Sequence, residues 1–232
     1  MFKKTGFFLL FLLLFVPGLY AQDINELIAN AKIKIDKVND YEASGRMKTN
    51  VAFLKVPVAN IKMYFKKPNR LKIKSEKGIS FIPKGAVSIN MNNILAEKNY
   101  TIIDAGTEKI GNTVVRVAKL LPTDDNSEVV LSTIYIDPIN NLIRKSRTTT
   151  KENGTFELEM TYGKFSEYGL PDKIIFSFNT KDYKLPKGVT FDFDDGEEQK
   201  KPSDTKNKKG RAEIDFKNYI INKGVSDDVF KQ

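Results

Sequence analysis

The chain contains no histidine and no cysteine among its 232 residues, which removes most of the side chains that do chemistry in proteins. Ser-His-Asp and Cys-His catalysis both use an imidazole as the base, so neither is available. Zinc sites built from histidine or cysteine are excluded for the same reason. An enzyme would have to work with carboxylates, lysines, tyrosines or oxygen-bound metals. No pair of carboxylates has a spacing that marks it as catalytic, so we expect neither an enzyme nor a cofactor.

One acidic stretch could in principle hold calcium. Its carboxylates lack the spacing of a calcium-binding loop, so we predict no metal site. A basic stretch follows directly, and the segment also contains glycine, proline, serine and asparagine. Such a sequence is typical of a mobile surface loop, which we place at residues 194–211. The acidic residues are Asp192, Asp194, Asp195, Glu197 and Glu198.

The first 21 residues have the three parts of a secretory signal peptide. Lys3 and Lys4 give a positive start, ten apolar residues run from 7 to 16, and Ala21 precedes the expected cleavage site. The apolar run is too short to span a bilayer as a helix. A bacterial lipid anchor would need a cysteine at the cleavage site, and the chain has none. We therefore expect an exported, soluble chain with a single domain over residues 22–232.

Basic residues outnumber acidic residues by 38 to 29, which gives a formal net charge of +9. The lysines are spread along alternating segments, which is typical of solvated strand faces rather than of a nucleic-acid track. We predict no nucleic-acid partner. A weak attraction to anionic membrane surfaces is the more useful interpretation of this charge.

The periodicity of the apolar residues predicts one helix followed by many strands. Apolar residues recur at spacings of three and four over residues 23–39, where Asp23 can cap a helix. Most of the remaining chain alternates apolar and polar residues, as half-buried antiparallel strands do. About ten strands in meander order predict a mainly β fold with a strongly curved antiparallel sheet. The later strands are expected at 100–108, 112–121, 128–137, 141–151, 155–165, 173–179 and 212–221.

Two early strands flank the sequence Lys66-Lys67-Pro68-Asn69-Arg70. Proline cannot donate a ladder hydrogen bond, so Pro68 is expected in the turn between two paired strands. The alternation places one apolar face on this pair of strands, made of Ile61, Met63, Phe65, Leu71 and Ile73.

Residues 79–98 interrupt the alternation, with Pro83 and Gly85 among apolar residues. We interpret this segment as a lid over the apolar face of the sheet. Its apolar residues include Phe81, Ile82, Met91, Ile94 and Leu95.

The strand-proline-strand block, after a helix and a long first strand, resembles the LolA/LolB-like family of bacterial lipoprotein carriers and receptors. Three later features resemble the family too, and together the resemblance covers roughly residues 24–230. They are Ile134-Tyr135-Ile136-Asp137-Pro138, Gly154 in the next hairpin, and Phe216-Lys217-Asn218-Tyr219.

The resemblance implies an incomplete β-barrel whose mouth is covered by helices and which encloses an apolar cavity for acyl chains. It implies a soluble, monomeric periplasmic carrier of lipoprotein or lipid cargo. The partners would be an inner-membrane lipoprotein-releasing transporter and an outer-membrane acceptor. That acceptor is anchored to the membrane through a cysteine. Because this chain has no cysteine, it is similar to the carrier. The cavity is accordingly assigned to Met47, Val51, Phe53, Ile61, Met63, Phe65, Leu71 and Ile73.

One position departs from the family. Its carriers typically have an arginine just before the proline, where it helps to hold the lid closed. Lys67 stands at this position, and lysine lacks the planar fork of arginine. The possible lid latch is therefore Lys67 or the neighbouring Arg70.

Other interpretations of the same residues stay open. A lipid-sensing regulatory module of this fold would hold a stable protein partner and transfer no cargo. An enzyme without histidine ranks below both binding functions. Taken one at a time, the apolar residues of the cavity are more often ordinary core packing of a β-sheet protein.

Overall fold

A computed structural model describes residues 23–51, 54–55, 58–68, 70–75, 100–152, 154–179 and 209–231. Over these ranges the chain forms one α-helix, two short 3-10 helices (η1 and η2) and one antiparallel sheet. None of these helices is long and apolar enough to cross a membrane. The elements are α1 (Ile24–Asp36), β1 (Asp40–Val51), β2 (Leu54–Lys55), β3 (Ala59–Lys66), β4 (Arg70–Ser75), β5 (Tyr100–Ile110), β6 (Thr113–Pro122), β7 (Val129–Asp137), β8 (Leu142–Thr150), β9 (Gly154–Thr161), η1 (Ser166–Tyr168), β10 (Lys173–Asn179), β11 (Lys209–Ile221) and η2 (Asp227–Phe230).

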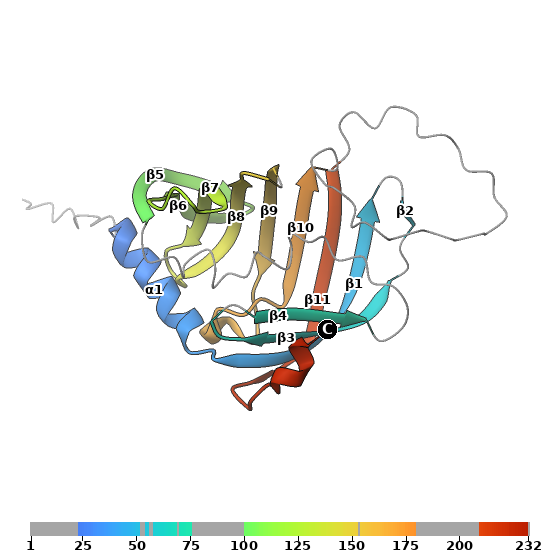
Figure 1. The fold of residues 1–232 in the computed structure, drawn as a ribbon. Coiled ribbons are helices and arrows are strands. Elements are labelled where there is room, and N and C mark those ends of the chain that lie inside the picture. Colours follow the sequence, from blue (N-terminus) through green and yellow to red (C-terminus); the bar gives the residue numbers. More distant parts are fainter. Residues whose placement is uncertain are drawn as a thin grey trace, which may run out of the picture.

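The sheet has eleven strands in the order β4-β3-β1-β11-β10-β9-β8-β7-β6-β5, and β2 pairs with β1 off this path. Neighbouring strands follow the chain in meander order, except that β11 lies between β1 and β10. The sheet does not close on itself, and it curls strongly, with α1 at one side (Figure 1). The mainly β fold predicted from the sequence, an incomplete barrel with an N-terminal helix, is confirmed.

The helix α1 packs its apolar stripe against the sheet. Asp23 caps its first turn, where its carboxylate accepts a hydrogen bond from the Asn25 amide at 3.1 Å. The buried residues of this stripe join a core cluster with side chains of β6 to β11. They are Ile24, Leu27, Ile28, Ala31 and Ile35.

The inward face of the first strands is the one predicted from alternation. In β1, Ala43 and Met47 are buried, whereas Arg46 and Lys48 are exposed. The buried residues of β3 are Ile61, Met63 and Phe65. The pairing register places Ala43 opposite Met63, so both strands turn their apolar residues to the same side.

At Gly45, β1 and β11 approach closely. The register of the two strands shifts between Ser44 and Gly45. A β-carbon at position 45 would come within 2.6 Å of the carbonyl oxygen of Asp215, a distance that the backbone cannot keep. The sequence assigns Gly45 no such role, because strand crowding depends on partners far away in the chain.

We expect Gly45→Ala to lower the free energy of unfolding by about 1–3 kcal/mol, since the added methyl group must push two central strands apart. Urea unfolding would measure this loss. The control is Ser44→Ala, on the opposite side of β1, with an expected change within about 0.5 kcal/mol. Equal losses in the two variants would contradict the crowding.

Several boundaries differ from the prediction. β9 ends at Thr161, and the residues that follow form η1, which ends at Gly169 in the left-handed conformation with φ 63°. β11 starts at Lys209, so the last three residues of the loop predicted at 194–211 belong to a strand. The rest of that loop, the segment 1–21 and the predicted lid at 79–98 lie outside the described residues.

Candidate lipid-binding cavity

An apolar cavity of about 80 Å³ lies against one face of six strands that are consecutive in the sheet, β4-β3-β1-β11-β10-β9. One wall comes from β1, β3 and β4, and the other from β9, β10 and β11, with the end of α1 beside them (Figure 1). The curl of the sheet therefore creates the cavity. Its lining residues are Ile35, Val38, Tyr41, Met63, Phe65, Leu71, Ile73, Leu158, Met160, Gly169, Leu170, Pro171, Ile174, Phe176, Ile214, Phe216 and Tyr219.

The wall nearest the sheet edge is built from two cross-strand pairs. Met63 of β3 lies opposite Ile73 of β4, and Phe65 lies opposite Leu71. Phe65 is fully buried, with its ring centroid 5.3 Å from that of Tyr41. Leu71 and Ile73 are only half-buried. The two half-buried side chains are therefore the part of this wall that can meet an entering molecule.

The two tyrosines of the lining place no charge in the cavity. The Tyr219 hydroxyl donates to the carbonyl of Pro171 at 2.8 Å, and the Tyr41 hydroxyl lies 3.4 Å from the sulfur of Met63. Burial raises the pKa of both hydroxyls well above the usual tyrosine range, so they stay neutral. Because both hydroxyls are already engaged within the protein, the cavity favours an apolar ligand over a polar one.

The size of the cavity limits what it holds in this state. Pockets for drug-sized ligands measure about 300–1,000 Å³, several times more. A ligand larger than a short apolar group therefore requires the walls to separate. Across the described ranges, no group of three acidic side chains lies where it could hold a metal ion.

The eight residues predicted for the cavity divide into three groups. Four of them line it, namely Met63, Phe65, Leu71 and Ile73. Met47 and Ile61 are 2% and 1% exposed and belong to the core cluster beside it. The side chain of Val51 and the whole of Phe53 lie outside the described residues. The same is true of the predicted lid residues Phe81, Ile82, Met91, Ile94 and Leu95.

The opposite wall was missed at the level of sequence. Leu158 and Met160 of β9 and Ile174 and Phe176 of β10 face the cavity. Their alternation predicts an inward face correctly. Nothing in the local pattern shows that the sheet curls far enough to bring this face toward β3 and β4.

Neither a family model nor a curated protein sequence matches the chain. Solved structures do match. An outer membrane lipoprotein-sorting protein domain from Vibrio parahaemolyticus has 11% identity and a TM-score of 0.55, covering 88% of this chain and 94% of that one. A LolA-superfamily protein from Nitrosomonas europaea has 9% identity and a TM-score of 0.56, covering 90% and 97%. The chain has the LolA-like fold. A DUF1329-family protein from Desulfovibrio piger is similar too, with 12% identity and a TM-score of 0.55, covering 90% and 97%.

In this LolA-like fold, Lys67 joins the turn between β3 and β4 to the end of α1. Its ammonium group donates to the carbonyl of Asp36 at 2.8 Å and lies 3.7 Å from the carboxylate of the same residue. The peptide bond between Lys67 and Pro68 is cis. Pro68 lies in the turn, as predicted. The contact of Lys67 thus fixes one end of the cavity wall to the helix, whereas any contact with the lid lies outside the described residues.

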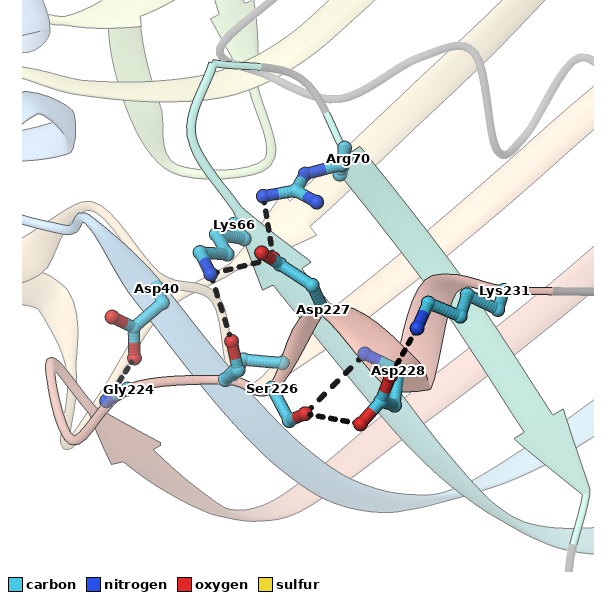
Figure 2. A network of polar contacts seen from close by, with 9 residues as sticks. Asp40, Lys66, Arg70, Gly224, Ser226, Asp227, Asp228 and Lys231 are labelled. Carbon is cyan, nitrogen blue, oxygen red and sulfur yellow. Dashed lines mark hydrogen bonds and ion pairs between the residues drawn. The ribbon is translucent and has the colours of Figure 1, made fainter.

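Arg70 holds the C-terminal segment of the chain against β4 (Figure 2). Its guanidinium lies 2.8 Å from the carboxylate of Asp227, and its central carbon lies 5.1 Å from the ring centroid of Phe230. Lys66 contacts the same carboxylate at 2.6 Å and donates to the carbonyl of Val225 at 3.1 Å. Asp227 therefore fastens η2 to the strands that form the outer wall of the cavity.

We expect the contacts of Asp227 with Lys66 and Arg70, which hold η2 to β3 and β4, to weaken as the pH falls below about 4. The hydrogen bond from Lys66, with the charges of Arg70 and Lys66, lowers the pKa of Asp227 below its ordinary value of 3.8. A lowered pKa means that the contribution is complete above the ordinary value and is lost as the pH falls through the lowered one. The amide NMR shifts of Val229 and Lys231, followed against pH, should report it. In Asp227→Asn this step should be missing, and an unchanged step would contradict the assignment.

Proposed function

We propose that this protein is a soluble periplasmic carrier that binds the acyl chains of lipoproteins or other lipids in this cavity. The observation that supports it best is the cavity itself, with one apolar wall from β1, β3 and β4, a second from β9, β10 and β11, and its tyrosine hydroxyls already engaged. The proposed role is binding and release, without a chemical reaction.

The free energy of exposing acyl chains to water explains why a carrier is needed. Moving one methylene group of an acyl chain out of water is favourable by about 0.8 kcal/mol. Exposing several acyl chains to water therefore costs on the order of tens of kcal/mol. A soluble protein moves such cargo only if it covers the chains. It must also release them, which favours side chains that repack easily. Met63 and Met160, one in each wall, meet this requirement.

Loading requires the cavity to widen, and the edge of the sheet is the part that can move. β4 is an edge strand, and β1 is the strand that connects the β3–β4 hairpin to β11 and the rest of the sheet. We infer that this hairpin swings away from β9 and β10 when an acyl chain enters. The contacts of Lys67 with Asp36 and of Arg70 with Asp227 would then limit the swing.

The proposed cargo and partners follow the proteins of similar fold. One of them is described as an outer membrane lipoprotein-sorting protein domain. On this basis we propose that an inner-membrane transporter delivers the cargo, that an outer-membrane acceptor receives it, and that the protein acts as a monomer.

Native mass spectrometry with lipid extraction would test the binding. The purified chain, incubated with diacyl phospholipid and then separated from vesicles, should retain species with the mass of bound lipid. Ile73→Glu should retain none, because it places a charge in the wall. A wild-type protein that stays free of lipid under these conditions would contradict the proposal.

Transfer distinguishes a carrier from a sensor. A loaded carrier should pass a fluorescent lipid to acceptor vesicles faster than the lipid escapes by itself. Binding without accelerated transfer would favour a lipid-sensing module and contradict the carrier role.

A further inference from the structure

The outer surface of the first strands is strongly basic. The outward side chains of β1, β3 and β4, apart from those near the contact of Lys66 and Arg70 with Asp227, include five basic residues and one acidic residue, Glu42. We call this surface the basic face. Its basic residues are Arg46, Lys48, Lys62, Lys72 and Lys74.

The pairing register gathers these charges into a compact patch. Lys62 of β3 lies directly opposite Lys74 of β4, with Ser44 of β1 on its other side. Lys72 lies opposite Tyr64 on the same face. Like charges on adjacent strands repel one another, so an anionic partner would relieve the repulsion between Lys62 and Lys74.

Only part of this charge is neutralised within the protein. Lys62 pairs with Glu42 at 2.9 Å. Arg46, Lys48 and Lys74 are exposed, and none of them forms an ion pair within 4 Å among the described residues. Asp215 and Glu213 of β11 lie opposite Arg46 and Lys48 in the register, but their carboxylates pair with Lys173 instead. Lys74 instead lies 5.8 Å from the ring centroid of Tyr64.

The outer surface of β8 to β11 shows what a balanced sheet face looks like in the same protein. Lys145 pairs with Glu157 at 3.0 Å, and Lys173 pairs with both Glu213 and Asp215. Five outward basic residues meet four outward acidic residues there. They are Lys145, Arg147, Lys173, Arg211 and Lys217, with Glu157, Glu159, Glu213 and Asp215. The excess of the basic face is therefore a local feature, not a uniform consequence of the net charge.

We propose that the basic face docks the protein on the surface of an anionic lipid bilayer. Protein interfaces are depleted in lysine and have an apolar centre, whereas four of the five basic residues here are lysines. Lysine side chains near an anionic bilayer each contribute about 1 kcal/mol of attraction without a shaped pocket. Tyr64, with an apolar ring and a polar tip, suits the headgroup region of a bilayer.

Docking would place the cavity wall next to the membrane. Met63 and Ile73 face the cavity from the same strands that carry Lys62, Lys72 and Lys74 on their outer side. This inference does not rest on the proposed function, because binding to the bilayer surface needs no cargo.

Vesicle cosedimentation at low salt would test the docking. The full chain should bind phosphatidylcholine vesicles that contain phosphatidylglycerol, should not bind phosphatidylcholine alone, and should detach as salt is added. The triple variant Arg46→Gln, Lys48→Gln, Lys74→Gln should bind at least about tenfold more weakly. No binding of the wild-type chain to the anionic vesicles would overturn the proposal.

A second triple variant controls for net charge. Lys109, Lys119 and Arg147 are exposed residues of β5, β6 and β8, and their replacement by glutamine changes the formal charge by the same amount. This variant should bind within about twofold of the wild type. An equal loss in both triple variants would overturn the assignment to the basic face. Lipid binding in the cavity, measured separately by mass spectrometry, should be the same in both.

Discussion

Phe65→Ala should lower the free energy of unfolding by about 3–5 kcal/mol, as loss of a buried aromatic side chain does. Phe65 is 0% exposed and packs against Tyr41 in the cluster beside the cavity. Domains of this kind are stable by about 5–15 kcal/mol, so the variant would lose a large share of the total. Urea unfolding followed by circular dichroism would measure the change.

The neighbouring residue provides the control for Phe65. Tyr64 lies on the same strand but points to the outer side and is half-buried. Tyr64→Ala should therefore cost less than about 1 kcal/mol. A Phe65→Ala variant as stable as the wild type would show that the wall of the cavity is not packed as described.

Ile73→Glu should abolish binding of acyl chains while the protein stays folded. Ile73 is half-buried in β4, opposite Met63, and lines the cavity. A carboxylate there can reach water in the free protein, but an acyl chain in the cavity would bury it, at a cost of several kcal/mol. We expect affinity for a fluorescent fatty acid to fall at least about a hundredfold, measured by titration.

Two variants make the Ile73 result specific. Val130→Glu adds the same charge in place of an apolar residue on β7 that is 49% exposed and does not line the cavity, so binding should be unchanged. Ile73→Leu keeps the wall apolar and should retain binding. Strong binding by Ile73→Glu, or an equal loss in Val130→Glu, would contradict the placement of the ligand.

The sequence was a good guide to which residues face inward. Strict alternation in β1 and β3 predicted that Met47, Ile61, Met63 and Phe65 are buried, and all four are. Alternation succeeds here because one side of the sheet packs against a core, so a slip by one residue would expose the whole apolar face. Pro68 was correctly placed in a turn for an equally local reason.

What depends on distant parts of the chain could not be predicted. The wall formed by Met160, Ile174 and Phe176 depends on the curl of the whole sheet. Lys67 reaches the carbonyl of Asp36, which is a contact that no motif around the proline reveals. These features arise from tertiary packing rather than from the residues next to them in sequence.

Burial also changes which substitutions can test the cavity. From the alternation alone, charged residues at Met63 or Phe65 would be expected to block binding without unfolding the chain. Both are buried, at 5% and 0% exposure, so an aspartate or glutamate there would destabilise the fold itself. Leu71 and Ile73 are the better sites because each lines the cavity and is only half-buried.

Photo-crosslinking with a fatty acid that carries a diazirine near its terminal methyl group tests the central claim most directly. After irradiation and digestion, mass spectrometry locates the modified residues. We expect adducts in β3 and β4 and in β9 and β10, on residues such as Ile73 and Met160, and we expect ordinary fatty acid to compete them away. Adducts confined to exposed apolar residues such as Val130 and Ile139, without competition, would contradict an acyl-binding cavity between the two walls.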